Sequence, residues 1–80
     1  MLNRVGQAWR LLEETDEGDR FVSLCLITEH VEEHDRYDGL VLDDAYAPDV
    51  GTLTRMDSAE AFREPSEPHE GSRFRWERVA

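Results

Sequence analysis

Apolar and polar residues alternate along most of this chain, which is the pattern of β-strands with one buried face. The strongest run covers residues 20–28 (RFVSLCLIT), is rich in β-branched and aromatic residues, and has turn-forming residues on both sides. Residues 36–44 and 50–56 are further short runs, and residues 73–79 (RFRWERV) alternate aromatic with charged side chains. These runs predict strands, the first of them buried along most of its length.

The N-terminal segment 3–14 supports two interpretations. Val5, Trp9 and Leu12 lie at helical spacing, whereas Leu11 falls with Val5 and Trp9 on one face of a strand. The polar, glycine-containing stretch that follows joins this segment to the strongest predicted strand, which favours a β-hairpin. We therefore expect a fifth strand here, while a helix over 3–14 would make the protein α+β.

Two other elements follow from turn chemistry. Residues 58–63 are expected to form a short helical turn, because Asp57 and Glu60 have the spacing of a capping box. Phe62 of this turn is expected to point into the core. Residues 64–72 contain two prolines and a glycine without an apolar anchor, so we expect an exposed, flexible loop.

Short strands and one helical turn within 80 residues predict a single all-β domain, residues 1–80. Tight turns between the strands favour a small five-stranded barrel, since closing a sheet removes edges that would otherwise aggregate. Trp9, Phe74 and Trp76 are expected to fill the barrel. The alternative is that these rings and Tyr37 form a groove for a Pro-rich peptide.

Two short motifs resemble known small barrels. Residues 5–9 (VGQAW) resemble the Gly-x-x-Trp first strand of SH3-like barrels in short bacterial and phage proteins, and residues 76–79 (WERV) resemble their last strand. The same opening followed by an Arg-led apolar strand is similar to MazF/PemK-type toxins. That likeness would imply endoribonuclease activity, but the Arg-Pro of those toxins is Arg20-Phe21 here. No catalytic residue is carried over, and the fold alone does not specify a function.

Cysteine content and apolar run length narrow the function classes. Cys25 is the only cysteine, so an intrachain disulfide and a Cys-cluster metal site are excluded. It lies within an apolar run, where we expect a small buried hydrophobe and not a reactive thiol. No apolar stretch approaches the roughly 20 residues that span a bilayer, and the N-terminus has no leader-like apolar region. We expect a cytoplasmic protein without a membrane partner.

The charge is strongly acidic, with 19 Asp and Glu against nine basic residues and a formal net charge of −10. Every basic residue is arginine, which is typical of GC-rich coding and favours an actinobacterial, phage or salt-adapted source. A negative field repels phosphate backbones, so direct nucleic-acid binding is disfavoured. The same acidity favours solubility in salt or imitation of a nucleic acid towards a basic protein groove.

The stretch EHVEEHDRYDG (29–39) contains the H-x-x-E-H pattern of one class of zinc protease. His30 and His34 are therefore weak metal candidates, with Glu33 between them to activate water. A strand-like run before the motif and turn-like residues after it leave little room for the helix such a site needs. We interpret the motif as an acidic loop or hairpin tip and expect no metal and no cofactor; a pH-sensing role for the histidines is an alternative.

These observations predict a non-enzymatic binding or accessory module, monomeric or weakly dimeric, that contacts a protein partner with a basic surface. The alternatives are an acidic nucleic-acid-mimic inhibitor of the phage type and a divergent MazF/PemK-like ribonuclease. The expected contact residues are acids of the 29–44 segment and one aromatic residue: Glu29, Glu32, Glu33, Asp35, Tyr37, Asp38, Asp43 and Asp44.

Overall fold

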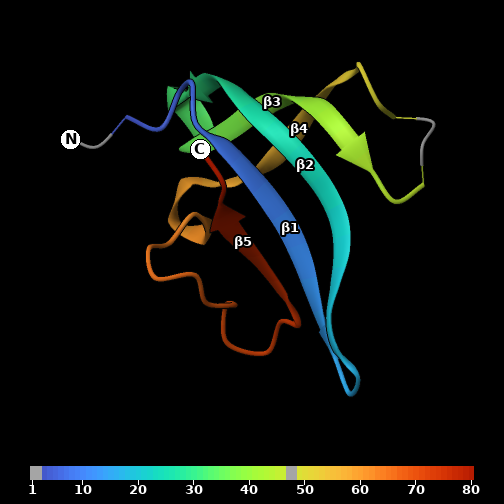
Figure 1. Ribbon diagram of the computed structural model, residues 1–80. Coiled ribbons are helices and arrows are strands. Elements are labelled where there is room, and N and C mark those ends of the chain that lie inside the picture. Colours follow the sequence, from blue (N-terminus) through green and yellow to red (C-terminus); the bar gives the residue numbers. More distant parts are fainter. Residues whose placement is uncertain (1–2, 47–48) are drawn as a thin grey trace.

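The computed structural model describes residues 3–46 and 49–80 and shows an all-β protein (Figure 1). One antiparallel sheet has the strand order β4-β3-β2-β1-β5. Its strands are β1 (Ala8–Thr15), β2 (Gly18–Val31), β3 (Arg36–Asp44), β4 (Leu53–Ser58) and β5 (Phe74–Arg78). The strand interpretation of the N-terminal segment is thus confirmed, and the α+β alternative is wrong.

The helical segments of the described chain are two 3-10 turns, η1 (Glu32–His34) and η2 (Ala59–Ala61). Neither is long enough or apolar enough to cross a membrane. The second turn is shorter than the predicted 58–63, and no side chain caps its start. The Asp57 carboxylate, expected in a capping box, instead accepts hydrogen bonds from the Ser58 backbone N–H at 2.8 Å and from the indole of Trp76 at 3.1 Å.

The sheet curls into a half-barrel because β-bulges interrupt its ladders. The register shifts at Leu11/Leu12 between β1 and β2, and at Leu24/Cys25 and Ile27/Glu29 between β2 and β3. A bulge bends its strand and increases the local twist. Figure 1 shows the result, in which β1 and β2 curve together along their length and enclose a concave side.

The core fills this concave side with residues from alternate strand positions. Trp9, Cys25, Ile27, Tyr37, Val41 and Trp76 are all buried there, and Ala61 and Phe62 join them from the segment after β4. Trp9 and Trp76 therefore fill the barrel, and Phe62 points inward, both as predicted. Phe74 does not, because it lies at the first position of β5, opposite Glu13, and remains 42% exposed.

Side chains close the seam between β4 and β5, since no ladder joins these two strands in the described residues. The hydrogen bond from Trp76 to Asp57 spans the seam. The Ser66 hydroxyl donates to the carbonyl of Trp76 and so anchors the irregular 64–72 segment along β5. Phe62 fills the open side, with its ring centroid 5.1 Å from that of Trp76. The small barrel is thus completed by packing and not by a continuous sheet.

Candidate functional site

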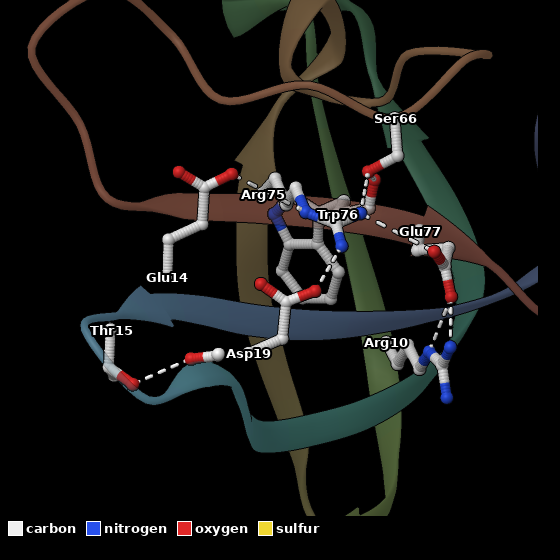
Figure 2. A network of polar contacts seen from close by, with 9 residues as sticks. Arg10, Glu14, Thr15, Asp19, Ser66, Arg75, Trp76 and Glu77 are labelled. Carbon is white, nitrogen blue, oxygen red and sulfur yellow. Dashed lines mark hydrogen bonds and ion pairs between the residues drawn. The ribbon is translucent and has the colours of Figure 1, made fainter.

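Most arginines are used in ion pairs on the sheet, and Arg75 is the centre of the largest network (Figure 2). From β5 it contacts Asp19 of β2, Glu14 of β1 at 3.8 Å and Glu77 at 3.4 Å. Glu77 also accepts two hydrogen bonds from Arg10 on the neighbouring strand β1. The network ties three strands together and neutralises carboxylates that would otherwise repel one another.

A pH prediction follows from Glu77. Its hydrogen bonds with Arg10 hold the pKa of this carboxyl below its usual range. A lowered folded-state pKa contributes stability above the unfolded value, about 4.3, and this contribution is lost as the pH falls through the folded pKa.

Replacing Glu77 with glutamine is expected to lower the melting temperature at pH 7 by a few degrees at most, because exposed pairs contribute under about 1 kcal/mol. The difference between the wild type and Glu77→Gln should shrink as the pH drops below about 4. Thermal unfolding followed by circular dichroism at several pH values measures it. If the difference in melting temperature between the two proteins stayed constant from pH 7 to pH 3, ionised Glu77 would not be the stabilising group.

Most of the remaining arginines also form ion pairs with carboxylates. Arg20 and Arg73 pair with the buried Glu13, and Arg4 and Arg78 pair with Glu64. Within the described part of the chain, Arg55 is the one arginine without an ion pair. The acids without an ion pair to any residue that the structure describes are Asp16, Glu17, Glu29, Glu32, Glu33, Asp43, Asp44, Asp49, Asp57, Glu60 and Glu70.

A pocket of about 740 Å³ lies where the β2–β3 turn meets η2. The backbone N–H of Ala59 donates to the carbonyl of Asp35 at 2.8 Å, which joins the two walls. Asp35 itself has φ 46°, so the chain reverses sharply after η1 and enters β3. The pocket is lined by Arg4, His30, Glu32, Asp35, Tyr37, Ala59, Glu60 and Phe62.

Aromatic rings form the apolar part of this pocket. Tyr37 is 4% exposed, and its ring lies 5.0 Å from that of His30 and 5.4 Å from that of Phe62. The contact with Phe62 is edge-to-face, a favourable arrangement for two rings. The core and the pocket therefore share Tyr37 and Phe62, so the core packing positions these side chains in the pocket wall.

Both basic groups of the pocket already have acidic partners. Arg4 is buried, lies 4.9 Å over the ring of Trp9 and donates to Glu64 at 2.9 Å. His30 Nε2 lies 3.0 Å from the carboxylate of Asp35. Glu32 and Glu60 have no ion-pair partner among the described residues, so the unbalanced charge at the pocket is negative.

The predicted contact residues separate into three places. Glu32, Asp35 and Tyr37 come together in the pocket, with Glu33 exposed beside them on η1. Tyr37 is a core residue that meets the pocket from inside, because it alternates inward on β3.

The other predicted acids lie on the sheet away from the pocket. Glu29 and Asp38 are cross-strand partners on β2 and β3, and Asp38 is bonded to Arg36 at 3.0 Å. Asp43 and Asp44 lie at the far end of β3, where Asp44 lines a second cavity of about 520 Å³. They are too far along the strand to share a site with Glu32.

Sequence reasoning missed Arg4, Glu60 and the site-lining role of Phe62. These residues come from segments before β1 and after β4, outside the acidic 29–44 stretch. The sequence predicted that Phe62 points inward. A local pattern does not indicate that its ring will lie beside the turn between β2 and β3.

The structure places the two histidines on different elements. His30 lies near the end of β2, which extends to Val31, and His34 ends the exposed turn η1 that joins β2 to β3. The motif thus lies at a hairpin tip, one of the two predicted arrangements, although His30 itself belongs to the strand. A strand followed by a single 3-10 turn cannot present both imidazoles as the α-helix of an H-x-x-E-H site does. No group of three or more His, Cys, Asp or Glu among residues 3–46 and 49–80 has a metal-binding arrangement.

Cys25 is buried in the core, 2% exposed, as predicted. Burial raises the pKa of its thiol, which keeps the sulfur protonated near neutral pH. Since the thiolate is the nucleophilic form, Cys25 acts as a packing residue.

The chain was compared with protein-family models, curated proteins and solved structures. None of these comparisons produced a match. The SH3-like and MazF/PemK-type resemblances therefore stay predictions, and the function has to be inferred from the residues of the pocket.

Proposed function

We propose that this protein is a non-enzymatic cytoplasmic module that binds a basic segment of another protein. The contact surface is the acidic end of the barrel, defined as Glu32, Glu33, Asp35 and Glu60. The observation that carries the proposal is a cluster of unpaired carboxylates beside a pocket. Glu32, Glu33 and Glu60 have no ion-pair partner among the described residues, and Glu32 and Glu60 line the pocket with aromatic rings.

Electrostatics then favours a cationic partner at this end. A concentration of one charge sign steers an oppositely charged partner and sets its orientation. The acidic end is exposed to solvent, so its attraction for a cation is screened over about 8 Å at physiological ionic strength. Binding should therefore weaken steeply as salt is added.

The arrangement of the arginines also supports a binding role over the ribonuclease alternative. An RNA-cleaving barrel needs cationic groups that contact phosphates. Here Arg10, Arg20 and Arg75 contact carboxylates instead. The nucleic-acid-mimic alternative uses the same acidic end, and it differs in requiring that DNA or RNA compete for the partner's groove.

The proposal is tested with a lysine-rich peptide as probe. The triple variant Glu32→Gln, Glu33→Gln, Glu60→Gln is expected to bind it roughly 3- to 150-fold more weakly, since exposed charges contribute about 0.2–1 kcal/mol each. Isothermal titration calorimetry at 50 and 300 mM salt measures the affinity and its salt dependence.

A matched control removes the same number of charges elsewhere: Asp16→Asn, Glu17→Gln, Glu70→Gln. Asp16 and Glu17 lie at the β1–β2 turn, at the opposite end of β2 from η1 (Figure 1). The control is expected to retain most of the affinity. Equal losses in the two triple variants would show that net charge alone attracts the peptide and would reject the acidic end as a site.

A further inference from the structure

We infer that the pocket between η1 and η2 receives the guanidinium group of an arginine side chain from the partner. This inference rests on the proposed function and names the side chain that the acidic end recognises. It depends on one hydroxyl without a hydrogen bond in the described chain, on the balance of charge around the pocket and on the shape of the pocket wall.

The polar group without a hydrogen bond in the described part of the chain is the hydroxyl of Tyr37, a residue otherwise buried in the core. The residue is 4% exposed, and its hydroxyl makes no hydrogen bond to any described residue. No fully buried side-chain nitrogen or oxygen in the described chain lacks a partner, so this oxygen must reach solvent. Tyr37 lines the pocket, and we place its accessible hydroxyl there. An accessible hydroxyl that no described side chain or backbone group occupies is free to accept a hydrogen bond from a bound donor.

The charges that face the pocket favour a cation. Arg4 is balanced by Glu64 at 2.9 Å, and His30 lies 3.0 Å from Asp35. Glu32 on η1 and Glu60 on η2 remain without ion-pair partners in the described chain. An anionic ligand would meet these two carboxylates, whereas a cation would be attracted by both.

The geometry favours arginine over lysine. A guanidinium is planar, carries five N–H donors and packs against aromatic faces, whereas an ammonium is a compact, strongly hydrated charge. The pocket offers aromatic walls from Tyr37, Phe62 and His30, and acceptors from Glu32, Glu60 and the phenol oxygen. Because these acceptors lie on different elements, the N–H groups along different edges of one guanidinium can each reach one of them. A volume of about 740 Å³ holds the side chain and part of its neighbours.

The test uses three lysine-rich peptides that differ at one central position, which is arginine, lysine or citrulline. Citrulline keeps the planar shape of arginine without its charge. The arginine peptide is expected to bind about 5- to 10-fold more tightly than either of the others, as a desolvated cation–π and hydrogen-bonded contact allows. Chemical-shift changes in ¹H–¹⁵N spectra should concentrate on the backbone amides of Glu32, Tyr37 and Glu60.

The variant Tyr37→Phe removes the phenol oxygen and keeps the ring in the core. It is expected to reduce the preference for arginine over lysine to less than about 2-fold. The control Tyr46→Phe removes a phenol from a residue that is 66% exposed and does not line the pocket. It should leave the preference unchanged. Melting temperatures of both variants show whether the fold is intact.

The outcomes separate the two proposals. If the three peptides bind equally and the acidic-end triple variant still weakens them, the arginine pocket is rejected and the binding module stands. A preference for arginine that survives Tyr37→Phe also rejects the pocket as assigned. If no peptide binds at low salt, both proposals fail.

Discussion

Replacing Phe62 with alanine is expected to lower the free energy of unfolding by about 3–5 kcal/mol, the usual cost of removing a buried aromatic ring. Phe62 is 3% exposed and fills the open side of the half-barrel. Its ring makes edge-to-face contacts with Trp9 and Tyr37 at 5.4 Å and a tilted contact with Trp76 at 5.1 Å. No ladder joins β4 to β5 in the described chain, so backbone pairing cannot compensate for the lost ring.

Small domains are stable by only about 5–15 kcal/mol, so Phe62→Ala should be largely unfolded well below the melting temperature of the wild type. Urea denaturation followed by tryptophan fluorescence measures the effect, because both tryptophans lie in this core. Phe62→Leu serves as the companion variant if the alanine variant does not fold. It keeps most of the apolar volume, and we expect a loss of about 1–2 kcal/mol. A loss below 1 kcal/mol in Phe62→Ala would show that the 3-10 segment does not close the barrel.

Replacing Gly39 with alanine is expected to cost about 1–3 kcal/mol, because the new methyl group would overlap other atoms. Gly39 lies on β3 opposite Ile27, beside the bulge that bends β2. A Cβ at this position would collide with the backbone carbonyl of Leu26 and with the sulfur of Met56. The backbone carbonyl cannot rotate away, so one of the strands must shift.

A second variant separates the two collisions. Met56→Ala in the Gly39→Ala background removes the sulfur but leaves the carbonyl, and it should not restore stability. Gly71→Ala is the control, because Gly71 has φ 80° and open space around its Cα. Its cost should be limited to backbone strain of about 1–2 kcal/mol. If Gly39→Ala were as stable as the wild type in urea denaturation, the close approach of Gly39 on β3 to the Leu26 carbonyl on β2 would be contradicted.

The same shift should reach the pocket. Tyr37 is two residues before Gly39 on β3 and on the same face, so a Cβ added at position 39 would point to the concave side, as the Tyr37 ring does. A displaced β3 would move the phenol away from Glu60 on η2. Gly39→Ala is therefore expected to weaken the preference for arginine peptides even under conditions in which it remains folded.

Local patterning was sufficient for the strands and for much of the core. The period of two in residues 20–28, 36–44 and 73–79 identifies strands because each side chain position alternates between the core and solvent. Trp9 and Cys25 were recognisable as core residues for the same reason, and turn chemistry located the β1–β2 hairpin. Strand alternation and turn formation are set by residues that are adjacent in the chain, so they can be recognised from the sequence alone.

Features that depend on bulges and on distant contacts were not available from the pattern. The extension of β2 through His30, the exposure of Phe74 and the partners of Arg75 all depend on register, which a single inserted residue changes. The pocket depends on more than register. Arg4, Tyr37 and Glu60 line one pocket only because the curled sheet brings the segment before β1, strand β3 and the turn after β4 to one end. The acidity of the chain was evident from its composition, but where that charge stays unpaired was set by the tertiary structure, because ion pairs form between residues close in space and far apart in the chain.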